Sequence, residues 1–251
     1  MPAGPDKIKE FRDTEWKQLY NYLQNVNLTS LKINQTTIEG VSVRIRTSGA
    51  DDLASLHTKS ITTAVTALAK AGYELPPLDF YLCASDTIPN VAMKTYTGGK
   101  AAPVILLGPK MWAKNPMMPG TNGMIVGGMA ANGVRGVANQ AYDGTQRFFG
   151  NPKQNAQGAC IVIHELGHVL HEYNNPGIFW EEMSAIQRGQ PSPNGNGWQN
   201  QSIAVSGYAG NNQLEFVAEV FAGINSGKDY GEAVLAVYGS LGGPVPTAVA
   251  V

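Results

Sequence analysis

The sequence predicts an α+β fold, in which a twisted mixed sheet with helices is followed by a smaller, mostly helical C-terminal lobe. Apolar residues recur at helical spacing in residues 6–26 and 51–72. Segments typical of strands lie between and after these helices, and the last third of the chain is again helical in pattern. We expect one domain over residues 1–251, with helices and sheet in 1–158, the helices of the lobe in 159–251, and a cleft between the two parts.

Composition narrows the class of protein. The chain has 251 residues, of which 43% are hydrophobic and 15% are charged, and its net charge is −1. We therefore expect a sizeable core and no nucleic-acid partner, because the basic surface that such binding needs is missing. No apolar run is long enough to span a membrane. Low charge and abundant Asn and Gly favour an extracellular protein, although residues 1–10 lack the apolar core of a signal peptide. We expect a monomer that is secreted or delivered to a target cell.

The first half of the chain predicts two helices and several strands. Residues 6–26 and 51–72 are the helices, and the second should stop at its terminal glycine. Residues 31–47 contain a strictly alternating segment whose polar face carries Arg44 and Arg46, and we expect both side chains to lie in solvent.

Two further strands are apolar throughout. They are residues 78–84 and 103–108, with a turn at Thr97–Lys100 between them. Cys83 and Cys160 both lie in apolar segments, so we expect two buried free thiols, with one disulfide between them as the alternative.

The second half predicts loops and then helices. Residues 109–158 are rich in Gly, Asn, Pro and Met, and within them 133–138 is either a short strand or a flexible loop. Helices are expected at 159–173, 178–188, 214–224 and 231–238. From Gly242 onward we expect a frayed tail.

His164, Glu165 and His168 form an H-E-x-x-H sequence in the most apolar of these helices. Residues four apart on a helix share a face and lie about 6 Å apart along the axis, so both imidazoles can bind one ion. Glu165 is rotated by about 100°, which places its carboxylate beside the ion as a proton acceptor for water. The alternative, two buried histidines satisfied by backbone carbonyls, is less favoured because unpaired buried polar groups cost several kcal/mol.

A catalytic zinc site needs about three protein ligands and one open position. His171 shares the face of His164 but lies roughly 10 Å along the axis from it, so we expect it at the surface or behind a ligand. The longer pattern H-E-x-x-H-x-x-G-x-x-H fails, because Asn174 stands where its third histidine would be.

Two glutamates on the apolar helix 214–224 are the better candidates. Glu215 and Glu219 lie four residues apart, and two carboxylates on one face repel each other unless a cation or hydrogen-bond donors intervene. We expect Glu215 to bind the metal and Glu219 to accept a hydrogen bond from a ligand histidine and orient it. The alternative is an ordinary exposed pair. Glu181 and Glu182 are reserve candidates that we expect to face solvent.

Residues Ser206–Ala222 resemble the second motif of gluzincin metalloproteases, and of the anthrax lethal factor type in particular. In that family a tyrosine precedes the ligand glutamate by seven residues and a second glutamate follows it by four. Tyr208, Glu215 and Glu219 reproduce both spacings. The resemblance covers roughly residues 160–222. It implies a zincin-like fold with an H-E-x-x-H active-site helix, a Zn²⁺ cofactor, and a Tyr208 hydroxyl that donates to the oxyanion of the tetrahedral intermediate.

These observations predict a zinc-dependent endopeptidase with a protein or peptide substrate, and the resemblance implies a toxin or effector role. A strand at 133–138 could hold the peptide by strand addition. Two alternatives stay open. One is a zinc-binding structural or interaction protein without hydrolase activity, and the other is a zinc hydrolase that acts on non-peptide bonds.

Overall fold

A computed structural model describes residues 4–24, 28–48, 51–83, 93–96, 103–107, 153–195, 197–206 and 208–247. Over these residues the chain has a mixed α+β fold of seven α-helices, one short 3₁₀ turn (Leu28–Ser30) and a five-stranded mixed sheet. The predicted fold class is therefore confirmed at this level. In the part of the chain described here, no helix combines the length and the apolar character needed to cross a membrane.

The sheet has the strand order β1-β2-β3-β5-β4. The strands are β1 (Lys32–Ile38), β2 (Val41–Ser48), β3 (Leu78–Cys83), β4 (Met93–Tyr96) and β5 (Val104–Leu107). The central pairs β2–β3 and β3–β5 are parallel, whereas β1 and β4 lie antiparallel to their neighbours at the two edges. Glu39 and Gly40 form the two-residue turn between β1 and β2, with φ of 47° and 84°, which suits the right-handed twist of a hairpin.

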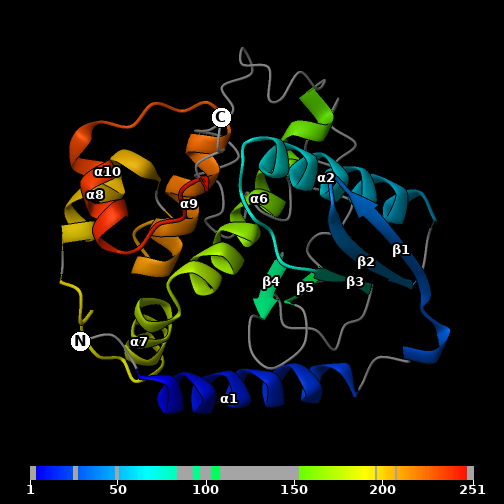
Figure 1. Cartoon of the computed structure of the whole chain (residues 1–251), viewed down its shortest axis with the longest axis horizontal. Coiled ribbons are helices and arrows are strands. Elements are labelled where there is room, and N and C mark those ends of the chain that lie inside the picture. The colour runs from blue at the N-terminus through cyan, green and yellow to red at the C-terminus, as the bar shows by residue number, and fades with distance from the viewer. Residues whose placement is uncertain are drawn as a thin grey trace, which may run out of the picture.

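Both faces of the sheet are covered by helices (Figure 1). Successive side chains of β3 point to opposite faces of the sheet. Phe80 and Leu82 belong to the main core, together with residues of α2 (Asp51–Lys70) and α6 (Lys153–Asn174). Tyr81 lies on the other face, which is covered by α1 (Pro5–Leu23). Strands that are buried on both faces read as continuous apolar runs, which explains the pattern of residues 78–83.

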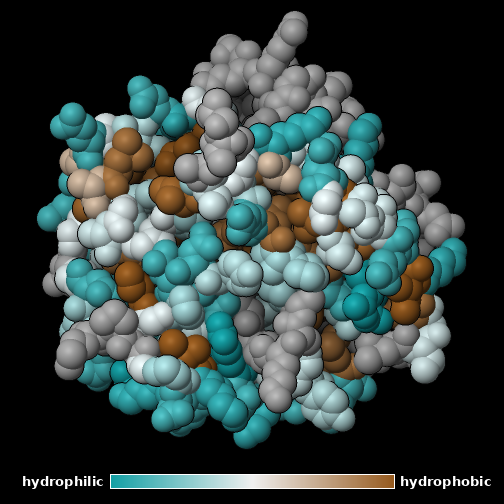
Figure 2. Space-filling model, viewed as in Figure 1, coloured by the Kyte–Doolittle hydropathy of each residue, from teal (hydrophilic) through white to brown (hydrophobic). Residues whose placement is uncertain are grey.

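Helix α1 packs one side against the protein and turns the other to solvent. Its outer side is mostly hydrophilic along the lower edge of the view in Figure 2, and it also carries the exposed rings of Trp16 and Tyr20. On the inner side, Arg12 donates through Nε to Glu172 Oε1 of α6 at 2.7 Å. Trp180 Nε1 donates to the same oxygen at 2.9 Å. Glu172 therefore joins α1, α6 and the following helix α7 (Pro176–Gln187) at one buried point.

The C-terminal lobe is helical, as predicted. It comprises α7, α8 (Gly197–Val205), α9 (Gln213–Asn225) and α10 (Glu232–Ser240). Helix α9 packs closely against α6, because Gly167 leaves room for the ring of Phe221. A Cβ at Gly167 would lie 2.9 Å from Phe221 Cδ1 and 3.4 Å from Ala218 Cα. The absence of a side chain at this position therefore sets the distance between the two helices.

Several details differ from the sequence-based expectations. Helix α6 begins at Lys153 and not at 159, and β4 was not predicted. The predicted turn at Thr97–Lys100 and the strand at 133–138 lie outside the described residues. The predicted frayed tail is wrong as far as Thr247, whose backbone N–H donates to Gly72 O at 3.0 Å. This backbone hydrogen bond holds the end of the chain against the residues that follow α2.

The expectation of a solvated arginine face is wrong for Arg46. Its Nε and Nη2 donate to the two oxygens of Asp79 at 3.1 and 3.2 Å, and its guanidinium lies 4.9 Å from the centre of the Tyr81 ring. Arg44 is more exposed and lies 3.7 Å from the same carboxylate. Asp79 comes from the neighbouring strand, so this pairing depends on strand register and could not be inferred from β2 alone.

Cys160 is a free, fully buried thiol, as expected. Its Sγ lies 3.3 Å from Ser226 Oγ, and burial raises the pKa of the thiol to about 12.

Replacing Gly167 with alanine should destabilise the protein, although alanine favours helices over glycine by about 1 kcal/mol. The new methyl group would force the fully buried Phe221 ring to move, and overpacking of this kind costs about 1–3 kcal/mol. The matched control is Gly239→Ala in α10, where an added Cβ meets nothing within 4 Å. Chemical denaturation should show a loss for Gly167→Ala and no loss for Gly239→Ala; equal effects at both positions would contradict the close packing.

Candidate metal centre

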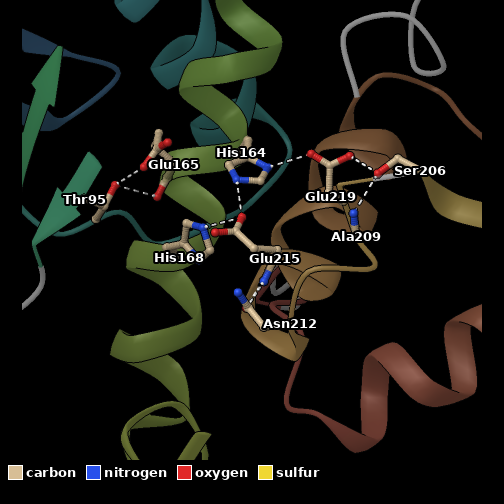
Figure 3. A network of polar contacts seen from close by, with 9 residues as sticks. All are labelled: Thr95, His164, Glu165, His168, Ser206, Ala209, Asn212, Glu215 and Glu219. Carbon is tan, nitrogen blue, oxygen red and sulfur yellow. Dashed lines mark hydrogen bonds and ion pairs between the residues drawn. The ribbon is translucent and has the colours of Figure 1, made fainter. Parts of the chain in front are cut away.

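Three side chains that were predicted as metal ligands converge between α6 and α9. One donor atom from each of His164, His168 and Glu215 lies within 4.8 Å of the other two. Glu215 Oε2 is 3.0 Å from His164 Nε2 and 3.4 Å from His168 Nε2 (Figure 3). Metal–ligand distances of about 2.0–2.2 Å with tetrahedral angles put donors roughly 3.4 Å apart. Two imidazole nitrogens and one carboxylate at this spacing fit a zinc ion.

The start of α9 fixes the position of Glu215. Asn212 is the N-cap of this helix, and its Oδ1 accepts a hydrogen bond from Glu215 N at 3.0 Å. The cap sets the first turn of the helix and so places Glu215 opposite the two histidines. A carboxylate in the first turn is also favoured by the positive end of the helix dipole.

Glu219 lies one turn further along α9 and is completely buried. Its Oε1 is 3.1 Å from His164 Nδ1, and its Oε2 accepts a hydrogen bond from Ser206 Oγ at 2.5 Å. The Ser206 hydroxyl oxygen in turn accepts from Ala209 N at 3.0 Å (Figure 3). Glu219 thus lies beside the ring nitrogen of His164 that faces away from Glu215, which is where a residue that orients His164 would have to be. That orienting role stays a prediction. Ser206, which the sequence did not indicate, holds Glu219 in place.

The charges and hydrogen bonds of this cluster favour positive charge between the two carboxylates. Burial opposes protonation of His164, but hydrogen bonds to Glu215 and Glu219 outweigh it and hold the pKa of His164 well above its ordinary value. Burial likewise opposes ionisation of Glu215, yet the neighbouring His168 and His164 hold the pKa of this carboxyl well below its ordinary value. A proton or a divalent cation can supply the positive charge that balances the two carboxylates.

Glu165 lies beside this cluster and is paired with the sheet. Thr95 of β4 donates its hydroxyl to Glu165 Oε2 at 2.5 Å (Figure 3). Neither the strand nor this contact was predicted. Thr95 stands 70 residues before Glu165, and only the packing of β4 against α6 brings the two together. The hydrogen bond fixes the direction of the Glu165 carboxylate.

Tyr208 lies next to the cluster, in the turn before α9. Its ring centre is 5.9 Å from that of His164. Burial is the largest cause that raises the pKa of Tyr208 far above its usual range, and the charges of Glu215, Glu165 and Glu219 raise it further. The phenol therefore stays protonated and acts as a hydrogen-bond donor.

All five of these groups line one cavity of about 320 Å³: His164, Glu165, His168, Tyr208 and Glu215. The volume lies in the range of about 300–1,000 Å³ that is typical of ligand sites. The arrangement therefore joins a candidate metal site, a proton acceptor and a neutral hydrogen-bond donor around one space.

Two other expectations for this region need correction. Of the two positions expected for His171, the surface is wrong: the residue is buried, its Nε2 lies 2.7 Å from Leu241 O, and burial lowers its pKa to about 3. Glu182 does not face solvent: it is completely buried and accepts hydrogen bonds from Ser192, Asn194 and Gln213. Neither belongs to the convergent group of three, and neither does the half-buried Glu181.

Comparisons with protein-family models, with curated proteins and with solved structures gave no match for this chain. The likeness of residues 160–222 to gluzincin metalloproteases therefore stays a prediction. Function has to be inferred from the site itself.

Glu215→Gln should abolish stoichiometric binding of Zn²⁺, because the neutral amide is a poor ligand and no longer balances the charge of the ion. Glu219→Gln should weaken binding by about 10–100-fold, the usual effect of removing a group that orients a ligand histidine. Competition with a chromogenic chelator measures both affinities. Glu232→Gln on the exposed side of α10 is the control. Unchanged affinity in Glu215→Gln would exclude this carboxylate as a ligand.

Proposed function

We propose that this protein is a zinc-dependent endopeptidase. The observation that carries the proposal is the placement of Glu165 beside three convergent metal-binding side chains on one cavity. Structural zinc sites are closed by four protein ligands, whereas catalytic sites have three and leave one position open. Among the described residues only three donors form the group, and all three line the cavity. This arrangement supports a catalytic site over a structural one.

Each residue has a part in the proposed reaction. His164, His168 and Glu215 would hold a Zn²⁺ ion, and a bound ion of this kind would supply a Lewis acid for the scissile carbonyl and for a water molecule. Glu165 takes a proton from the attacking water and passes it to the leaving amine. Because Oε2 accepts the Thr95 hydroxyl, we assign the proton transfer to Oε1. Tyr208 stays protonated and can donate to the oxygen on which negative charge develops.

The sheet edge supports a peptide as the substrate. In the described sheet β4 is the last strand, it packs against α6, and its Thr95 contacts Glu165. An extended peptide that paired with this edge would pass next to the proton acceptor, with its main chain held by strand hydrogen bonds. The predicted strand at 133–138 is not needed for this mode of binding. A secreted or cell-delivered effector role is a further proposal that rests on composition and on the resemblance. Adding wild type and Glu165→Gln to cultured cells would test it.

Glu165→Gln should retain zinc and lose activity by about 10²–10⁴-fold, because the amide cannot accept the proton. The measurement pairs metal analysis with hydrolysis of a mixed peptide library in the presence and absence of chelator. Glu232→Gln again serves as the control. A variant that keeps most of its turnover would exclude Glu165 as the base, and zinc binding without hydrolysis in wild type would favour the structural alternative.

Thr95→Val should lower kcat by about tenfold and leave zinc affinity unchanged. Valine has a similar shape but cannot donate the hydrogen bond that directs Glu165, and a hydrogen bond to a charged group contributes about 1.5–3 kcal/mol. Thr95→Ser keeps the hydroxyl and should restore most of the activity. Equal activities of the valine and serine variants would show that the contact has no role in positioning Glu165.

A further inference from the structure

Glu182 of α7 is a completely buried side chain that the proposed reaction does not use. Its Oε2 accepts a hydrogen bond from Gln213 Nε2 of α9. Its Oε1 accepts from Ser192 Oγ at 2.7 Å and from Asn194 Nδ2 at 2.6 Å, both in the loop between α7 and α8. One carboxylate therefore joins three segments of the C-terminal lobe.

Gln213 is the first residue of α9, the helix that carries the candidate ligand Glu215. The hydrogen bond from Glu215 N to Asn212 Oδ1 joins two residues of the same turn, so it fixes the conformation of that turn. It does not fix where the turn lies relative to α6, which carries the two candidate histidine ligands. Contacts with other elements have to do that.

The close packing of α9 on α6 lies farther along the helix. Phe221 follows Glu215 by six residues, which is about 9 Å along a helix axis. Around the first turn of α9 the contacts come from α7 instead. Leu214 belongs to a buried cluster with two aromatic side chains of α7, and Gln213 donates to Glu182. The part of α9 that carries Glu215 is thus held by α7.

Helix α7 is itself fixed to α6. The ring of Phe179 packs edge-on against that of His171, with 5.4 Å between the ring centres, and Trp180 Nε1 donates to Glu172 Oε1 at 2.9 Å. Helix α7 therefore connects the last turn of α6 to the first turn of α9. Glu182 makes the polar part of this connection, and the aromatic cluster makes the apolar part.

We propose that Glu182 is a positioning residue for the metal centre. Through Gln213 it holds the first turn of α9 in the place from which Glu215 can meet the two histidines of α6. Its contact with the first residue of α9 also puts a carboxylate near the positive end of this helix, where negative charge is favoured. The inference rests on the metal centre of the proposed function and does not depend on which bond is cleaved.

The first test removes the contact and then restores it with the two groups exchanged. Gln213→Met keeps the length of the side chain without its donor, and we expect Zn²⁺ affinity to fall by about tenfold. In the double variant Glu182→Gln/Gln213→Glu, the amide of residue 182 can donate to the carboxylate of residue 213, so affinity should return to within about threefold of wild type. Competition with a chromogenic chelator measures both. Glu181→Gln, at the half-buried neighbouring position of α7, is the matched control and should keep the wild-type affinity.

The second test separates positioning from stability. Co²⁺ can occupy sites built for Zn²⁺, and its visible absorption bands report the geometry of the ligands. Gln213→Met should alter these bands, and the double variant should reproduce those of wild type. Urea unfolding of the metal-free proteins measures stability alone. A loss of stability in Gln213→Met with wild-type zinc affinity and wild-type cobalt bands would show a purely structural contact and overturn the inference.

Gln213→Asn takes the place of Gln213→Met if the latter does not fold, because the shorter side chain keeps the amide and cannot reach Glu182 from the same backbone position. Comparison with Glu215→Gln separates the two proposals. If Glu215→Gln loses zinc while the folded single variant at Gln213 keeps it, only the positioning role fails. If Glu215→Gln also keeps zinc, the metal centre is wrong and the positioning role falls with it.

Discussion

The close contact between α6 and α9 brings together charged groups that would be unfavourable in either helix alone. Gly167 lets the two helices approach until Phe221 fills the space. Glu215 and Glu219 then face His164 from two sides, at 3.0 and 3.1 Å. Buried carboxylates without partners would cost several kcal/mol each. The packing of two apolar helices therefore stabilises the polar cluster, and the cluster in turn fixes which side chains may face each other across the interface.

The remaining contacts of the site form two supports on opposite sides of this interface. On the side of the sheet, Thr95 holds the Glu165 carboxylate. On the side of the lobe, Ser206 holds Glu219, and Asn212 caps the helix that carries Glu215. The first support comes from β4, which is distant in sequence from both helices, and the second comes from the residues just before α9. The orientation of the reactive groups thus depends on strand β4 and on the turn before α9 as much as on the two helices themselves.

The sequence could predict those features that depend on the spacing of residues within one helix. The histidines of α6 share a face because four residues make about one helical turn, and Glu215 stood out because an apolar helix had no other reason to carry it. Thr95 and Glu15 could not be predicted, since each reaches the cavity only through tertiary packing of an element distant in sequence. We expected Glu182 to face solvent because most glutamates in proteins do. That average takes no account of the hydrogen-bond donors that Ser192 and Gln213 supply to this buried carboxylate.

Glu172 anchors α1 to the helix that carries both candidate histidine ligands, through Arg12 and Trp180. On the proposed assignments, the metal ligands and the proton acceptor belong to α6 and α9, and Tyr208 lies in the turn before α9. Helix α1 carries none of these groups and is joined to α6 at one buried ion pair. Related proteins could therefore diverge in the rest of the first helix while the reaction chemistry stays under constant selection.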